Sequence, residues 1–159
     1  GAWESKGSQL LKIDNQETND LHKALAHIHS IGALSCLILG ATGGDPAHEV
    51  ANLLTCSTIP LETRWQTQTH EYLFFNPGAS YSIDFEAGQE FSLFALERAT
   101  GVTLKGARFP LEDEALMRGS RGLHNQATAM RIDLAYEAGN LMMIRALREE
   151  APLGDGNEA

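Results

Sequence analysis

The chain has 159 residues, of which 43% are apolar, and a formal net charge of −9 at pH 7. This length suits one domain or two small ones, and the apolar fraction is enough for a buried core. An acidic chain without a cluster of Lys and Arg repels a nucleic-acid backbone, so we expect no nucleic-acid binding. The longest apolar run, residues 33–41, is too short to cross a bilayer, and no basic region followed by an apolar stretch opens the chain. We therefore expect neither a membrane-spanning nor a secreted protein.

Residues 8–59 predict the order strand, helix, strand, helix. In the first helix Leu21, Leu25 and Ile28 recur at helical spacing, and Asn19 is a favoured N-cap. The continuous apolar run at 33–40 predicts a parallel strand that is covered on both faces. A second helix should follow the glycine-rich turn after that strand.

After Pro60 the apolar period changes to two. The segments with this period are WQTQTHEYLFF (65–75), ASYSIDF (79–85), EFSLFAL (90–96), GVTLKGA (101–107), MRIDLAY (130–136) and LMMIRAL (141–147). Short β-rich segments separated by turn residues are typical of a β-sandwich or a jelly-roll-like barrel. The acidic run 111–114 should face solvent. The predicted fold class is therefore α/β followed by all-β.

The predicted division places an α/β part at 1–60, a β-sandwich at 61–148 and an acidic tail at 149–159. The tail is too polar to become ordered on its own. We expect residues 150–159 to lie against another chain, with Asp155 and Glu158 facing basic residues there.

Both cysteines, Cys36 and Cys56, lie in apolar runs without metal-ligand spacing. We expect reduced, buried thiols and therefore an intracellular, reducing compartment, with the cytoplasm and the mitochondrial matrix as equal alternatives.

The glycine-rich turn GATGGDPAHE (40–49) has two interpretations. A strand, a glycine turn and a helix N-terminus together present backbone N–H groups that bind phosphate well. However, the turn matches neither of the common phosphate-loop motifs. Asp45 as N-cap and Pro46 as first helical residue explain the same residues as a simple helix start.

Four stretches together carry a family resemblance: DNQETNDLHKAL (14–25), GATGGDPAHEVANL (40–53), TGVTLKGARFPLED (100–113) and GLHNQA (122–127). They resemble the thiamine pyrophosphokinase family, which transfers diphosphate from ATP to thiamine with Mg²⁺. The resemblance implies part of a Rossmann-like nucleotide-binding layer, followed by a β-sandwich that helps to bind thiamine. It also implies a homodimer with sites at the interface.

The resemblance assigns roles to individual residues. If the chain is active, Gln16 and Asp20 are catalytic and Asp20 also holds the metal. The residues implied on the nucleotide side are Lys23, Gly43, Gly44, His48 and Asn52. The residues implied on the thiamine side are Phe109, His124 and Asn125, with His124 at a position where the family has Ser. An aromatic before Pro in a β-rich region is also typical of a core residue, so Phe109 has that alternative.

The departures from the family pattern fall on charged positions. Asn15 and Ala47 stand where the family has Asp, Asn19 where it has Thr, and Asp45 where it has Arg. Diphosphoryl transfer needs metal-holding carboxylates and cations against the phosphate oxygens. Ala47 can hold no metal, and it gives His48 no carboxylate partner for work as a base. The family's upstream Asp-x-Asp motif would lie before residue 1, so we expect either a fragment or a chain that lacks that half.

Two functions follow as hypotheses. The first is a thiamine pyrophosphokinase-like domain that has lost catalysis and serves as a structural or interaction subunit of a larger assembly, without a cofactor. The alternative is an active kinase that uses ATP and Mg²⁺, with the missing motif supplied by a preceding segment or a partner chain. Between them lies a chain that binds thiamine or ATP without reaction.

Overall fold

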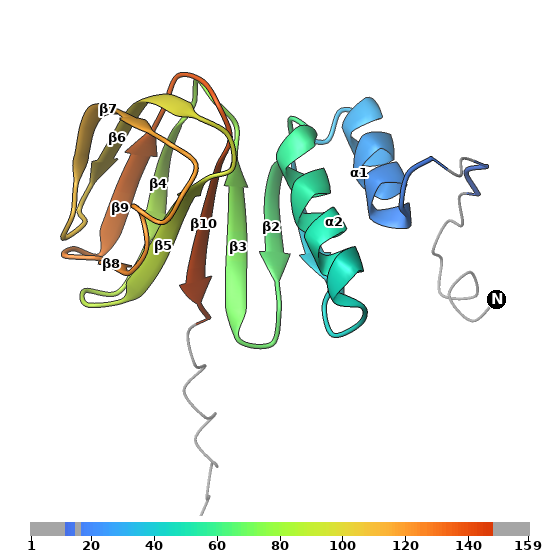
Figure 1. Ribbon diagram of the computed structural model, residues 1–159, viewed down its shortest axis with the longest axis horizontal. Coiled ribbons are helices and arrows are strands. Elements are labelled where there is room, and N and C mark those ends of the chain that lie inside the picture. Colours follow the sequence, from blue (N-terminus) through green and yellow to red (C-terminus); the bar gives the residue numbers. More distant parts are fainter. Residues whose placement is uncertain (1–11, 15–16, 148–159) are drawn as a thin grey trace, which may run out of the picture.

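The computed structural model describes residues 12–14 and 17–147. The helices are α1 (Asp20–Ser30) and α2 (Pro46–Thr58), and the strands are β1 (Ser35–Leu39), β2 (Glu62–Gln66), β3 (His70–Phe75), β4 (Ser80–Asp84), β5 (Glu90–Ala95), β6 (Ala99–Lys105), β7 (Leu111–Leu116), β8 (Asn125–Gln126), β9 (Arg131–Ala135) and β10 (Leu141–Ala146). Figure 1 shows the helices at one end and the strands β4 to β9 at the other. Most of the predicted strand before α1 lies outside the described residues, and the tail at 149–159 lies wholly outside them.

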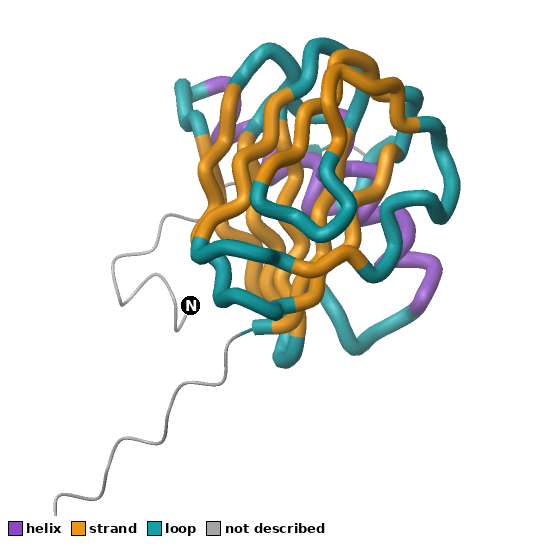
Figure 2. Tube along the Cα trace, turned by 90° about the vertical axis from the view of Figure 1, so that its left-hand side faces the viewer, coloured by secondary structure: helices purple, strands orange, loops and turns teal. Residues whose placement is uncertain are grey.

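The strands form two sheets. The larger has the order β1-β2-β3-β10-β5-β8 and the smaller the order β4-β9-β6-β7. β1 pairs with β2 in parallel, and the other ladders are antiparallel. The two sheets pack face to face, and Figure 2 shows them from their outer end with the helices behind. The larger sheet is continuous across the predicted boundary at residues 60 and 61.

Strand β10 packs against one hydrophobic core on each of its two faces. Leu141 and Met143 face the core between the sheets, whereas Met142 packs in the core beneath the helices. Its neighbour β3 divides in the same way, with Phe75 on the sandwich side and Phe74 on the helix side. Successive strand residues point to opposite faces, so both faces of this strand pair are covered.

The helix starts agree with the sequence. Asn19 caps α1, and its side chain accepts a hydrogen bond from the His22 N–H at 2.8 Å. Asp45 caps α2, and Pro46 occupies the first turn. A cap acts within one turn of chain, so its residue type alone predicts it.

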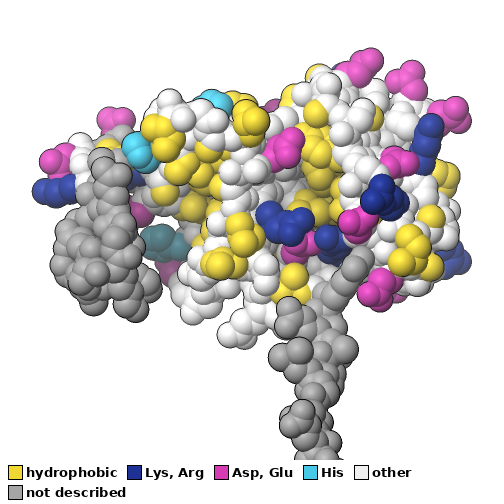
Figure 3. Space-filling view, turned by 180° about the vertical axis from the view of Figure 1, so that it is seen from behind, with side chains coloured by type: hydrophobic (Ala, Val, Ile, Leu, Met, Phe, Trp, Pro, Cys, Tyr) yellow, Lys and Arg dark blue, Asp and Glu magenta, His cyan; other side chains and the backbone are white. Residues whose placement is uncertain are grey.

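The prediction for the run 33–40 is half right. β1 is parallel to β2, but it is not covered on both faces: Ile38 is buried, whereas Leu37 and Leu39 are 53% and 66% exposed. β1 is the terminal strand of the larger sheet in the described chain, and the smaller sheet packs over β3, β10 and β5. The face that bears Leu37 and Leu39 is therefore open to solvent, and hydrophobic side chains lie exposed on this end of the molecule (Figure 3).

Two further predictions need correction. The segment 65–75 is not one strand but β2 and β3, because the Thr67 hydroxyl accepts hydrogen bonds from the N–H groups of Thr69 and His70 and closes a turn. The acidic run 111–114 is largely exposed as expected, yet it forms most of the edge strand β7. Cys56 is buried as predicted, but Cys36 is only partly buried.

No helix in the described part of the chain is long and apolar enough to span a membrane.

Candidate functional site

The N-terminus of α1 is tied to α2 and to the glycine turn by two side-chain amides. The Asn19 side chain donates to the Asn52 Oδ1 at 3.1 Å, and the Asn52 amide donates to the Ala41 carbonyl at 3.4 Å. Asn52 was expected on the nucleotide side. Here its amide connects three chain segments at the carboxyl end of β1, where anions bind in α/β folds.

Asp20 and Lys23 lie together in the first turn of α1. The Lys23 Nζ is 3.2 Å from the Asp20 Oδ1. The Lys23 side chain is only 16% exposed, whereas the Asp20 side chain is fully exposed. Lys23 thus presents a partly buried cation beside the Asn19 and Asn52 bridge. Gln16, the other predicted catalytic residue, lies outside the described residues.

The glycine turn is closed by the acidic side chains of its own helix. The Gly43 N–H donates to the Glu49 Oε1 at 2.8 Å, and the Ala47 N–H donates to the Asp45 Oδ1 at 3.0 Å. The Asp45 Oδ2 is 3.2 Å from the His48 Nδ1, so His48 has a carboxylate partner that position 47 could not give it. Gly44, which the resemblance placed on the nucleotide side, is exposed in the same turn.

These contacts shift the titration of Asp45. The Ala47 N–H and then the His48 imidazole hold the pKa of the Asp45 carboxyl below its ordinary value of 3.8. The carboxylate is therefore charged at neutral pH, at the helix end where a phosphate would have to bind.

The described residues of this region do not fit a Mg²⁺–ATP site. No group of three His, Cys, Asp or Glu side chains among them could hold a metal ion. The Asp20 carboxylate is paired with Lys23, and those of Asp45 and Glu49 accept backbone N–H groups. A triphosphate at the glycine turn would meet the carboxylates of Asp45 and Glu49, which repel phosphate oxygens.

A second candidate site is a pocket of about 380 Å³ in the β-sandwich. Its lining brings together Phe109 and Asn125, which are 16 positions apart in sequence, with Arg108 and Arg121. Phe109 is 58% exposed, so the alternative that it is a core residue is wrong. The Arg108 guanidinium lies 5.4 Å from the Phe109 ring centre. An exposed aromatic face in a pocket suits a flat ring ligand.

Asn125 holds the segment that carries Phe109. Its side chain is buried, and its Oδ1 accepts from the N–H of Phe109 at 3.0 Å and from the N–H of Gln126 at 2.9 Å. Its amide group donates to the Phe109 carbonyl at 2.9 Å. Most of the hydrogen-bonding capacity of this carboxamide is thus used within the protein. The sequence identified Asn125 but gave no sign that its partner is the Phe109 backbone.

Two further residues shape this pocket and were not identified from the sequence. Gly122 lies against β5, where an added Cβ would be 1.9 Å from the Leu93 carbonyl oxygen. Arg121 pairs with Glu114 of β7 across the pocket wall at 2.5 Å. Neither contact is local in sequence, so no pattern pointed to it.

His124 is exposed, and it is not among the residues that line the pocket. Its backbone is in the left-handed region with φ of 53°, and its N–H donates to the Ser92 hydroxyl at 3.3 Å. Its assignment to the thiamine side stays a prediction.

The two candidate sites lie at opposite ends of the folded molecule, as its described residues show it. α1 and the start of α2 are at one end of Figure 1, and β6, β7 and β8 are at the other. Within one copy, the described residues of the two sites therefore lie far apart (Figure 1).

No family model and no curated protein sequence matches the chain. Solved structures do match. Thiamine pyrophosphokinase from Bacillus subtilis has a TM-score of 0.75 and 21% identity, over 92% of this chain and 71% of that one. The protein of the same name from Geobacillus thermodenitrificans has a TM-score of 0.69 and 23% identity, over 86% and 65%. The one from Candida albicans has a TM-score of 0.68 and 12% identity, over 92% and 68%.

The fold and sites define a chain in which a helix pair and a glycine turn adjoin a two-sheet β-sandwich with a pocket of its own. That fold is the fold of the thiamine pyrophosphokinases. The chain spans about two thirds of the length of these solved structures.

Proposed function

We propose that this chain is a thiamine pyrophosphokinase-like domain that has lost diphosphoryl transfer and serves as a structural or interaction subunit of a larger assembly. The observation that carries the proposal is the closed glycine turn. The Glu49 carboxylate accepts the hydrogen bond of the Gly43 N–H, and the Asp45 carboxylate accepts that of the Ala47 N–H at the N-terminus of α2. In this interpretation, the helices and β1 are the remaining part of a Rossmann-like nucleotide layer.

Charge explains why this arrangement opposes catalysis. In the family pattern, position 45 is an Arg and position 47 an Asp. With Asp45, a carboxylate replaces a bidentate cation beside the phosphate, and Ala47 removes a metal ligand. Catalysis of phosphoryl transfer depends mainly on positioning the phosphate and neutralising its charge. The two changes together weaken both effects.

The open face of β1 supports a role in assembly. Leu37 and Leu39 on this strand and Leu34 just before it are all more than half exposed. A terminal strand with exposed apolar side chains favours pairing with a further strand or chain. The partner by resemblance is a second copy of the chain, or a different subunit of a complex.

The direct test is a coupled assay of thiamine diphosphate formation with ATP and Mg²⁺, together with calorimetry of each ligand alone. We expect no turnover and no ATP binding. Turnover at an ordinary enzymatic rate would refute the proposal. Binding of thiamine without turnover would restrict the loss to the nucleotide side.

A variant pair sharpens this test. Asp45→Asn with Glu49→Gln keeps hydrogen-bonding groups at both positions but removes both charges. We expect it to bind inorganic diphosphate more tightly than the unmodified chain does, because the repulsion at the glycine turn is removed. Glu112→Gln with Asp113→Asn, on exposed β7 at the far end, removes the same charge and should leave diphosphate binding unchanged. Equal gains in both pairs would show that only net charge matters.

The alternative, an active thiamine pyrophosphokinase, is favoured by one observation: the sandwich pocket keeps its aromatic face and the Asn125 support. In that case Asp20 and Lys23 of one copy would act with Phe109 and Asn125 of another, because the two ends are far apart within one chain. Activity that appears only when a segment with the Asp-x-Asp motif is added would establish this alternative.

A further inference from the structure

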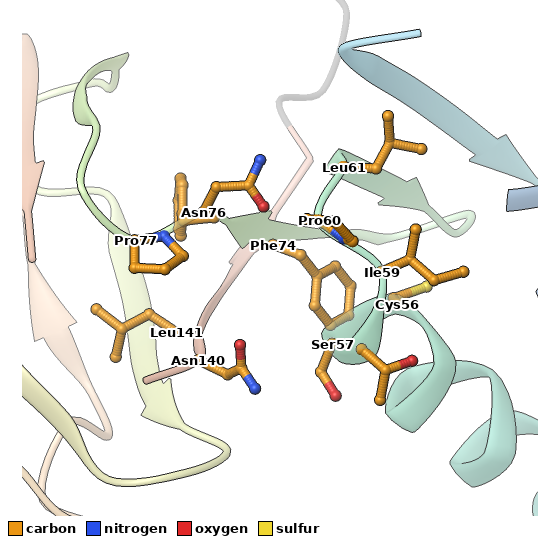
Figure 4. A pocket seen from close by; sticks show the side chains of 12 residues that line it. Cys56, Ser57, Ile59, Pro60, Leu61, Phe74, Asn76, Pro77, Asn140 and Leu141 are labelled. Atoms are coloured by element: carbon orange, nitrogen blue, oxygen red, sulfur yellow. The ribbon is translucent and has the colours of Figure 1, made fainter. Parts of the chain in front are cut away.

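A third site lies where the end of α2 meets the sandwich. It is a pocket of about 200 Å³ between the last turn of α2, the end of β3 and the start of β10. Figure 4 shows Phe74 across its middle, Asn76, Pro77 and Asn140 on one side and Ser57 and Ile59 on the other. The closed glycine turn is at the opposite end of α2, and the lining of this pocket shares no residue with that of the sandwich pocket, so it is separate from both sites described above.

Two carboxamides in this pocket have no hydrogen-bond partner in the described part of the chain, those of Asn76 and Asn140. Their backbones are fixed: the Asn76 N–H donates to the Tyr81 hydroxyl at 2.9 Å, and the Asn140 carbonyl accepts from the Leu96 N–H at 2.9 Å. Both side chains are half-buried at the pocket wall. A carboxamide in a partly buried position gains from a partner, so the pair offers ready acceptors and donors to a ligand.

The opposite wall is electrostatically negative. α2 ends here, its last turn has no basic side chain, and the final carbonyls of a helix carry partial negative charge. The hydroxyls of Ser57 and Thr58 donate to carbonyls one turn back, so they can only accept a further bond from a ligand.

The lining holds no charged side chain. Burial raises the pKa of the Cys56 thiol to about 12, so this residue stays neutral. The floor is apolar, formed by Phe74, Leu141 and Pro60. The volume of the pocket suits a single six-membered ring, because a cavity of roughly 150 Å³ accepts benzene.

We propose that this pocket binds a small cationic ring compound with N–H donors, such as a ring amidine or amine. The ring would lie on Phe74, and its N–H groups would donate to the carboxamide oxygens and to the carbonyls at the end of α2. An anion of the same size would meet those carbonyls unfavourably and bind more weakly. This site goes beyond the proposed function and does not depend on it.

The test uses three probes of one shape on the full chain: benzamidine, which is a cation, benzamide, which is neutral, and benzoate, which is an anion. Amide chemical shifts in ¹H–¹⁵N NMR spectra would be followed during each titration. We expect benzamidine to bind with a Kd on the order of 1 mM. The largest shifts should be at Asn76, Asn140, residues 57–59 and Leu61. Benzoate should bind at least about threefold more weakly, as the charge preference of a helix end requires.

Matched variants decide the role of the carboxamides. Asn76→Leu with Asn140→Leu keeps side-chain size, and we expect roughly tenfold weaker benzamidine binding, the usual loss for two hydrogen bonds. Asn140→Ala serves if the double variant does not fold, and Thr128→Val on a distant loop is the control. The proposal is overturned if the shifts are scattered over the acidic surface, if benzoate binds as well as benzamidine, or if the asparagine variants bind like the control.

Discussion

Replacement of Asn125 by leucine tests the central claim about the sandwich pocket, that this residue positions the Phe109 segment. Asn125 is 5% exposed, and leucine has a similar size, so the change removes hydrogen bonds and leaves no large cavity. Three bonds are lost: the one that the Phe109 N–H donates, the one that the Phe109 carbonyl accepts, and the one that the Gln126 N–H donates.

Each lost hydrogen bond costs about 0.5–1.5 kcal/mol, and a buried group left unsatisfied costs about 1–3 kcal/mol. Phe109 lines the pocket and is largely exposed, whereas the Gln126 N–H lies in strand β8. We therefore expect Asn125→Leu to lower the free energy of unfolding by about 2–4 kcal/mol. Urea denaturation measures this loss, and amide hydrogen exchange should be faster at Phe109 and Gln126 in particular.

A control and a second variant separate positioning from general damage. Gln126→Leu removes only the exposed bond to the Gly88 carbonyl and should cost less than about 1 kcal/mol. Asn125→Asp keeps both acceptors but loses the donor to the Phe109 carbonyl. Burial should raise the pKa of the new carboxyl, so this variant should be closest to the unmodified chain in acid and lose stability as pH rises through the raised pKa. The positioning role is refuted if the free energy of unfolding of Asn125→Leu lies within about 0.5 kcal/mol of that of the unmodified chain and amide exchange at Phe109 is unchanged.

Three further outcomes are expected. Gly122→Ala should prevent correct packing of the loop before β8, because its Cβ would overlap the Leu93 carbonyl. Thermal unfolding followed by circular dichroism should then show a lower melting temperature. An unchanged melting temperature would contradict the close approach. Tyr136→Phe should cost about 1–3 kcal/mol in urea denaturation, because the hydroxyl donates to the Phe75 carbonyl at 2.5 Å inside the core, and a neutral result would mean that this bond is worth little. The contribution of Asp45 to stability is present above its ordinary pKa of 3.8 and is lost as pH falls through its lowered value, so the unmodified chain and Asp45→Asn should converge in stability in acid and differ at pH 7.

The sequence by itself determined the local features of this protein. Asn19 and Asp45 cap their helices through contacts within one turn, so residue type was sufficient to predict them. The period of two after Pro60 predicted most strands of the sandwich, because alternation follows directly from strand geometry. Four stretches together, among them the motif around Phe109, pointed to the thiamine pyrophosphokinase fold.

Only the tertiary structure decided which surfaces are covered and which polar groups are already bonded. Apolar content alone did not reveal that β1 is a terminal strand with one open face, because coverage depends on where the second sheet lies. Nor did it reveal that Glu49 closes the glycine turn or that Asn125 holds Phe109. The carboxamides of Asn76 and Asn140 meet the end of α2 only because strands far apart in sequence converge there. Such contacts depend on side-chain direction and sheet order, and neither is encoded in a window of neighbouring residues.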